Sequence, residues 1–193
     1  MPNESLKKNF LDRLFIFAKK NIKNLIILLA LVFIFLIVFL FYSNAQEKNN
    51  IKIAEQYTKA SILINEKKIN ESKLLLKFII EKKHKFYSPL ALYLVIDNNI
   101  IDDTAYIISS FDKILTINSL EDEHLNLIKI KKAIYLINLD DEKLIRKTLD
   151  PIINSNSVWR NMSINLLSEY FLSKNQKEKS QKYILLLNSA TNK

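Results

Sequence analysis

The sequence predicts an all-α protein in which a single N-terminal transmembrane helix is followed by a solenoid of about four helical hairpins. Three observations carry this prediction: one uninterrupted apolar run, apolar residues at helical spacing from Ile51 onward, and turn residues every fifteen to twenty positions. No sustained alternation of apolar and polar residues occurs between hairpin turns, so strands are not expected. The predicted divisions are a basic cytoplasmic tail at 1–24, the transmembrane helix at 25–42 and a periplasmic helical domain at 46–193.

The apolar run reads LIILLALVFIFLIVFLFY and extends from Leu25 to Tyr42 without a charged or amide side chain. Eighteen helical residues cover roughly 27 Å, which matches the hydrocarbon layer of a bilayer. No side chain inside the run is ionisable, whereas ion paths and proton relays in membranes need such groups. The run therefore predicts an anchor that interacts with the lipid bilayer, and not a transport path.

The charges on either side of the run predict its orientation. The tail has six basic residues against two acidic ones, whereas the residues that follow the run are balanced, so the N-terminus is expected in the cytoplasm. Ser43-Asn44-Ala45 has the small residues of a signal-peptidase site, which leaves a cleaved signal peptide open as an alternative. The run is longer than the apolar part of most signal peptides, which favours an uncleaved anchor. The six basic residues are Lys7, Lys8, Arg13, Lys19, Lys20 and Lys23.

The composition argues against several classes of function. The 193 residues include no Gly and no Cys. Phosphate-binding loops, dinucleotide fingerprints and nucleophile elbows need glycine, and thiolate catalysis and Cys-ligated zinc need cysteine. His84 and His124 have no ligand-spaced partners, and the acidic residues before His124 are typical of the first turn of a helix. We expect no enzyme activity, no metal and no cofactor.

The net charge of +9 raises the question of nucleic acid. Only three of the 29 basic residues are arginine, the side chain that reads bases and phosphates with two hydrogen bonds. The lysines are spread along the whole chain. No nucleic-acid partner is therefore expected.

Beyond the apolar run, the pattern predicts eight further helices, at 48–65, 70–84, 88–97, 103–116, 119–138, 140–154, 157–173 and 176–190. Ser88 followed by Pro89 is typical of a helix start. Asp150-Pro151 predicts a kink or an early stop in the sixth of these helices. Because glycine is absent, the left-handed turn positions are assigned to asparagines, namely Asn98, Asn99, Asn138 and Asn154.

Short connections make consecutive helices antiparallel neighbours, so the eight helices form four pairs. Small residues are expected where paired helices approach closely. The set Ala60, Leu63 and Ser72 recurs 108 positions later as Ser168, Phe171 and Ser180. That displacement is three units of 36, close to the roughly 34 residues of a tetratricopeptide repeat. The two middle pairs match less well, with the small partner of Ala91 displaced to Ala105, and a non-repetitive helical bundle is the alternative.

Three stretches resemble a known family, the membrane-anchored tetratricopeptide-repeat-like proteins that include the ancillary subunit of the bacterial Sec translocon. They are the basic tail with its apolar span and the following IAEQYTKASILINEKKINESKLLLKFI, the opening Tyr87-Ser88-Pro89-Leu90-Ala91, and Leu149–Leu187 with its Trp-Arg pair. The last resembles the alphaproteobacterial version. The Gly-Asp expected in the paired turns is replaced by Lys67-Lys68 and Asn175-Gln176.

This resemblance implies a domain on the periplasmic side of the bacterial inner membrane that binds translocon subunits, periplasmic chaperones or secreted client proteins without catalysis. Aromatic residues on the first helix of each pair are candidates for a partner groove, although such residues are more often core. A self-associating envelope or cell-division assembly factor, and hence a homo-oligomer, is the alternative function. The groove candidates are Tyr57, Tyr93, Tyr135 and Trp159.

Overall fold

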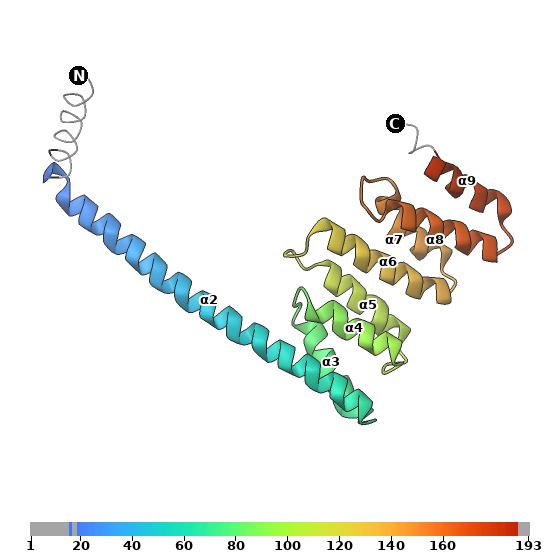
Figure 1. The fold of residues 1–193 in the computed structure, drawn as a ribbon, viewed down its shortest axis with the longest axis horizontal. Coiled ribbons are helices and arrows are strands. Elements are labelled where there is room, and N and C mark those ends of the chain that lie inside the picture. The colour runs from blue at the N-terminus through green and yellow to red at the C-terminus, as the bar shows by residue number, and fades with distance from the viewer. Residues whose placement is uncertain (1–15, 17–18, 189–193) are drawn as a thin grey trace, which may run out of the picture. The chain divides into compact units, whose positions relative to one another are not determined.

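The computed structural model describes residues 16 and 19–188, which are helical except for their connecting turns. No strand occurs within these residues, as the sequence predicted (Figure 1). The chain divides into two compact units, 1–52 and 53–193. The division falls inside helix α2, and the two units are described separately below.

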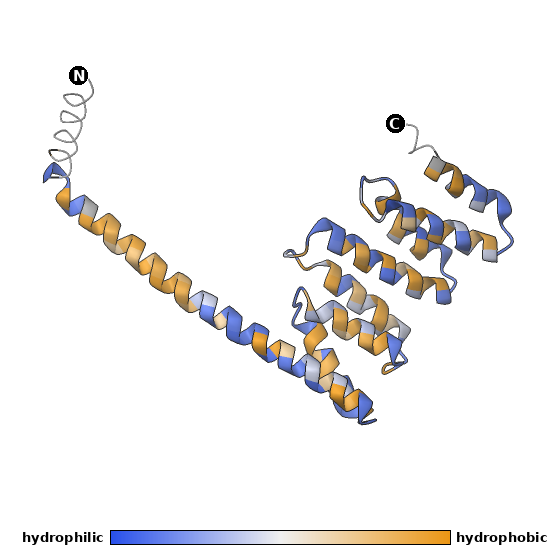
Figure 2. Ribbon diagram, viewed as in Figure 1, coloured by the Kyte–Doolittle hydropathy of each residue, from blue (hydrophilic) through white to orange (hydrophobic). Residues whose placement is uncertain are grey.

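Helix α2 spans Ile22–Asn65 and includes the predicted transmembrane segment 25–42. The sequence predicted a separate helix beginning at residue 48, whereas the structure continues one helix through residues 43–47. Figure 2 shows an unbroken hydrophobic stretch in the first unit. Ile37 is the least exposed of its large apolar side chains between Ile26 and Tyr42, at 39%. No described residue covers this stretch. By its length and composition, α2 is long and apolar enough to cross a membrane.

Seven further helices lie in the second unit, and each packs against the next along the chain. The first and last residues of all seven helices lie within three positions of the predicted ones. They are α3 (Ile69–Glu81), α4 (Tyr87–Asp97), α5 (Thr104–Leu115), α6 (Asp122–Asn138), α7 (Glu142–Ile153), α8 (Arg160–Ser173) and α9 (Lys177–Asn188). Helix α7 runs through Pro151 and ends only two residues later.

The helix starts repeat at a nearly constant interval. The second helices of the four pairs begin at residues 69, 104, 142 and 177, so their starts are 35, 38 and 35 residues apart. The pairs α2–α3, α6–α7 and α8–α9 also share a connection of three residues, while α4–α5 has six. The chain therefore repeats one helix–turn–helix unit four times in its second unit.

The same backbone motif ends the first helix of every pair. A residue with positive φ follows the helix by two positions: Lys67, Asn99, Asp140 and Asn175. After α2, the N–H of Lys67 donates to the Ile64 carbonyl and the N–H of Lys68 to the Leu63 carbonyl. This pair of bonds is the Schellman motif, which satisfies carbonyls that the helix leaves open. It recurs after α4 and α8.

The asparagine assignments were correct only at Asn99. Asn98 and Asn154 have negative φ, and Asn138 is the last residue of α6. At the third turn an aspartate, Asp140, adopts the left-handed conformation. Lysine does so at the first turn, so residue type alone does not select the left-handed position.

Predicted helix starts were partly wrong as well. Ser88 does not cap α4: it lies inside the helix, where its hydroxyl donates to the Ile79 carbonyl at 2.6 Å. The caps that form are aspartates. Asp103 accepts from the N–H of Tyr106 and Asp141 from that of Leu144, each at 2.9 Å. A short acidic side chain before a helix satisfies one of its open N–H groups.

The second unit has two apolar clusters that meet at α6. The first is built mainly from α3, α4 and α5 and reaches Ile128; the second begins at Ile130 and includes α7 and α8. Phe111 and Phe171 are the largest fully buried side chains, one in each cluster. Each cluster thus draws on helices that are neighbours along the chain.

Candidate functional site

The four aromatic candidates for a partner groove occupy different surroundings. Tyr57 is half-buried, and its ring lies 5.5 Å from that of Tyr87. Burial, and then the neighbouring Tyr87, raise the pKa of Tyr57. The ring of Tyr135 lies 6.3 Å from that of Phe111 and packs against the first core cluster. These two tyrosines mainly stabilise contacts between helices.

Trp159 precedes α8 and ties the third pair to the fourth. Its indole N–H donates to the Glu123 carbonyl at 3.0 Å. The hydroxyl of Ser157 donates to the Glu123 carboxylate at 2.6 Å and accepts from the Asn126 amide at 3.1 Å. Trp159 therefore belongs to a polar connection between neighbouring helix pairs, with its ring against the second cluster.

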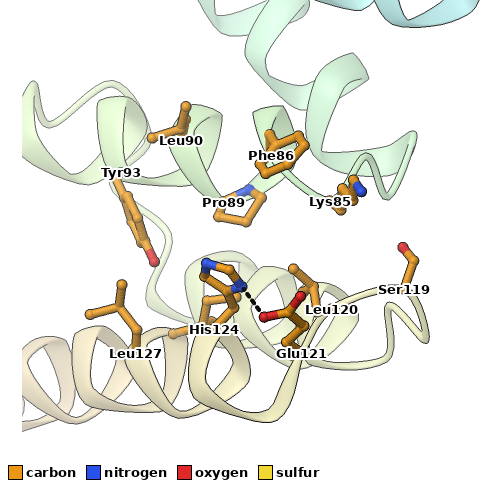
Figure 3. A pocket seen from close by; sticks show the side chains of 11 residues that line it. Lys85, Phe86, Pro89, Leu90, Tyr93, Ser119, Leu120, Glu121, His124 and Leu127 are labelled. Carbon is orange, nitrogen blue, oxygen red and sulfur yellow. Dashed lines mark ion pairs between the residues drawn. The ribbon is translucent and has the colours of Figure 1, made fainter. Parts of the chain in front are cut away.

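Tyr93 differs from the other three because it borders a cavity of about 240 Å³ between α4 and α6. Figure 3 shows its ring extending from α4 toward Leu127 of α6. Burial raises the pKa of Tyr93 to about 12, so the phenol is neutral at physiological pH. The cavity is lined by apolar residues with a polar rim: Phe86, Pro89, Leu90, Tyr93, Leu120, Leu127 and Ile128, and at the rim Lys85, Ser119, Glu121 and His124.

Helical periodicity explains why these side chains face one space. Phe86, Leu90 and Tyr93 recur at intervals of four and three residues, which places them on one face at the start of α4. His124 and Leu127 do the same on α6. Two of the apolar lining residues are exposed to solvent at the mouth of the cavity: Phe86 at 56% and Leu90 at 41%.

The polar rim is asymmetric. The Lys85 ammonium lies 4.9 Å from the centre of the Phe86 ring. On the opposite side, the Nδ1 atom of His124 lies 3.9 Å from a carboxylate oxygen of Glu121, as the dashed line in Figure 3 marks. Beyond the lining residues, the Lys131 ammonium lies 5.7 Å from the centre of the Tyr93 ring. Cations therefore border both aromatic walls.

The chemistry of this cavity is that of binding. No three His, Asp or Glu side chains within the described residues converge to hold a metal ion. Most small-molecule sites in proteins measure about 300–1,000 Å³, so the cavity is too small for a typical cofactor. An apolar cavity of this size, with cations at its edge, fits one large side chain of another molecule.

The residues predicted at the close approaches between paired helices lie there in the structure. Ser72 on α3 donates to the Ala60 carbonyl of α2 at 2.9 Å, and both residues are fully buried. In the last pair the hydroxyls of Ser168 and Ser180 lie 2.8 Å apart. Leu63 and Phe171 are also buried. In each Schellman motif, the carbonyl of this residue accepts the hydrogen bond that spans five positions of sequence.

The two middle pairs do not use small residues on both helices. Ala105, expected to be the partner of Ala91, is exposed. Thirty-five residues after Ser72, the corresponding buried side chain is Ile107, and 38 residues later it is Ile145. The middle pairs thus have isoleucine where the first pair has a small side chain on its second helix.

Exposed large apolar side chains are unevenly distributed over the middle of the repeat array. Helices α5 and α7, each the second helix of its pair, expose none. In these two middle pairs, the first helices and the residue just before α4 expose three: Phe86, Leu90 and Ile134. The outer second helices differ from α5 and α7, since α3 exposes Leu74 and α9 exposes Leu185.

Sequence reasoning identified Tyr93 but missed Phe86, Leu90 and Leu127. Phe86 lay between two predicted helices, in a segment predicted as a loop, and the two leucines were not singled out from the apolar periodicity. The contribution of α6 depends on how the second and third pairs are stacked, which no local pattern encodes. The one available signal was the continuation of the apolar pattern of α4 into Phe86.

No protein-family model matches this chain, and neither a curated protein nor a solved structure matches it in the comparisons with known proteins.

Proposed function

We propose that this protein is a non-enzymatic, membrane-tethered scaffold that binds other proteins, accessory to the Sec translocon or to periplasmic chaperoning of secreted proteins. Its second unit is, in this proposal, a tetratricopeptide-like solenoid. The interval of 35, 38 and 35 residues between second helices supports this assignment, as does the recurring left-handed turn. The buried isoleucines Ile107 and Ile145 in the middle pairs are departures from the small-residue packing of such repeats.

The observation that carries the proposal is the apolar cavity between α4 and α6, together with the exposed apolar side chains Phe86, Leu90 and Ile134 of these two helices and the residue before α4. In a solenoid, equivalent helices of successive repeats line one surface, which is the usual place for partner binding. The second helices α5 and α7 of the middle pairs expose no large apolar side chain. A surface of this kind fits extended, partly apolar segments of client proteins.

The exposed apolar part of α2 supplies the tether. We assign it as an uncleaved anchor in the bacterial inner membrane, with the basic tail in the cytoplasm and the second unit in the periplasm. Tethering restricts clients to those that emerge nearby and raises their effective concentration without adding a contact.

Affinity purification from gently solubilised membranes tests the proposed function. The full-length protein is compared with a chain that lacks residues 1–45. We expect translocon subunits or periplasmic chaperones to be enriched with the full-length protein only. Recovery of the protein alone, or of division and envelope proteins, contradicts the proposal.

A pair of variants ties any recovered partner to the proposed surface. Leu90→Asp places a charge at the mouth of the cavity, where the side chain is exposed enough for folding to survive. Ser109→Asp on α5 makes a comparable change on the polar second-helix surface. The proposal predicts loss of partners with Leu90→Asp and their retention with Ser109→Asp.

Membrane topology is testable separately, because the chain has no native cysteine. A membrane-impermeant maleimide applied to spheroplasts is expected to label Ser109→Cys and to leave Ser5→Cys unlabelled. The reverse pattern overturns the orientation. A mature N-terminus at Gln46, detected by intact mass, overturns the anchor and favours a cleaved signal peptide.

The alternative function, a self-associating envelope or cell-division assembly factor, is favoured by the exposure of the apolar part of α2, since such helices also pair with one another. Sedimentation of the detergent-solubilised protein separates the two functions. A tight dimer that recruits no client favours self-association.

A further inference from the structure

We propose that the cavity between α4 and α6 binds one large apolar side chain of an extended client segment, with acidic residues two positions before and two positions after it. This inference rests on the proposed function and adds the chemistry of the client. It is carried by the size of the cavity, by the two cations at its aromatic walls and by the spacing between those walls.

The size of the cavity limits what enters it. About 240 Å³ bounded by Pro89, Leu90 and Leu127 offers an apolar space without a charged group on its floor. Burying one Phe or Leu side chain there removes apolar surface from water on both partners. A central apolar anchor in a pocket is also the arrangement that dominates binding energy at protein interfaces.

The two lysines supply the acidic preference. Lys85 lies over Phe86 and Lys131 over Tyr93, and neither ammonium forms an ion pair within residues 19–188. Elsewhere in the second unit, Lys113, Lys132, Lys174 and Lys179 each contact a carboxylate. What distinguishes Lys85 and Lys131 is their position against the two aromatic side chains of the cavity, where each ammonium can contact a carboxylate of a bound molecule.

The spacing sets the positions of the acidic residues. Phe86 and Tyr93 are seven residues apart on one face of α4, a rise of about 10.5 Å. In an extended client, side chains two positions on either side of the anchor share its face and are about 13 Å apart. Flexible lysine side chains span the difference. Acidic residues directly next to the anchor point away from α4 and are expected to contribute less.

Glu121 carries a negative charge at this rim. Within the part of the chain that the structure describes, one of its carboxylate oxygens lies 3.9 Å from the Nδ1 atom of His124. Glu121 repels an acidic client at the Lys85 end of the cavity. Replacing it by glutamine is therefore expected to strengthen binding of the acidic segment by up to about threefold, a gain in the range of exposed charge interactions.

The test uses the full-length protein in nanodiscs of phosphatidylcholine, whose zwitterionic headgroups add no net charge. The probe is a fluorescent, otherwise Ser-rich peptide with a central Phe and Asp at the second position on each side, followed by anisotropy. Phe→Ala in the probe is expected to weaken binding about tenfold or more. Changing each Asp to Asn is expected to weaken it by about two- to fivefold, and moving both next to the Phe has a similar effect.

Matched variants assign the acidic preference to the two lysines. Lys85→Gln with Lys131→Gln is expected to abolish the difference between the Asp and Asn probes while the Phe requirement persists. Lys177→Gln with Lys182→Gln removes two exposed charges from α9 and is expected to leave the difference unchanged. Thermal unfolding of both double variants verifies that they fold.

The outcomes separate this inference from the proposed function. Equal binding of Asp, Asn and Lys probes overturns the acidic preference and leaves client binding intact. If the Lys85→Gln, Lys131→Gln variant still binds the Asp probe more tightly than the Asn probe, the two lysines are not the source of the acidic preference and the inference is overturned. Failure of all probes, while affinity purification still recovers secretion partners, overturns the inference alone; failure of both experiments overturns the proposed function as well.

Discussion

The hydroxyl oxygens of Ser168 and Ser180 lie 2.8 Å apart in the buried contact between α8 and α9. Ser72 makes the equivalent contact with Ala60 in the first pair, also across twelve positions of sequence. In the first pair and in the last pair, a serine hydroxyl thus joins the two paired helices. In the two middle pairs, the position that corresponds to Ser72 is an isoleucine.

Replacing Ser180 by valine is expected to destabilise the protein by about 1–3 kcal/mol. The added methyl groups overpack the contact, and the hydroxyl of Ser168 loses one of its partners. Urea unfolding followed by circular dichroism measures the change. Ser109→Val, at an exposed site on α5, is the matched control and is expected to stay within about 0.5 kcal/mol. Equal losses in the two variants would contradict the packing role of Ser180.

Much of the helical architecture followed from periodicity, and the exceptions have local causes. Left-handed positions were predicted from residue type, but lysine and aspartate, at Lys67 and Asp140, adopt positive φ two positions after their helices. Sequence patterns report propensities, whereas chain closure between packed helices selects the conformation.

The candidate site was predictable only in part. Tyr93 stood out as an aromatic on a first helix, but so did Tyr57 and Tyr135, which pack between helices. What distinguishes Tyr93 is that α4 and α6 leave a space beside it. That space depends on how α4 and α6 pack against each other, which has no local sequence signature.

The first turn offers a direct test of backbone strain. Lys67 has φ 60°, a conformation that costs a residue with a Cβ atom roughly 1–2 kcal/mol. Lys67→Gly is therefore expected to raise the free energy of unfolding, by up to about 1 kcal/mol after the entropy lost by glycine. The neighbouring Lys68 has φ −86°, so Lys68→Gly is expected to lower it. The same direction of change in both variants would contradict this explanation.

Asp140 links the third and fourth pairs and makes their stability depend on pH. Its carboxylate accepts from the Lys174 ammonium at 2.6 Å and from the Tyr170 hydroxyl at 2.9 Å. Lys174, and then Tyr170, lower the pKa of Asp140 below its ordinary 3.8. A lowered folded-state pKa stabilises the protein fully above the unfolded value, and this contribution disappears as pH falls through the folded value.

Asp140→Asn is therefore expected to be less stable than the parent at pH 7, and the two proteins are expected to converge as the pH falls below about 4. Asparagine tolerates the positive φ of this position, so the backbone is preserved. Urea unfolding across the pH range measures the difference. Asp97→Asn, which removes an exposed carboxylate without a recorded ion pair, is the control and is expected to show no such convergence.

Arg160 fastens the end of the array through two carbonyls. Its Nε atom donates to the Ile153 carbonyl at 2.9 Å and its Nη2 atom to the Leu186 carbonyl at 3.3 Å, so one guanidinium joins the ends of α7 and α9. A lysine ammonium does not present two donors in this fixed geometry.

Arg160→Lys is expected to cost about 1 kcal/mol, with faster amide hydrogen exchange concentrated in α9. The control is Lys143→Arg, an exchange of basic side chains at an exposed position of α7, which is expected to change stability by less than about 0.5 kcal/mol. Unchanged exchange in α9 of Arg160→Lys would mean that apolar packing of Tyr183 and Leu187 on the second cluster holds this helix without the arginine.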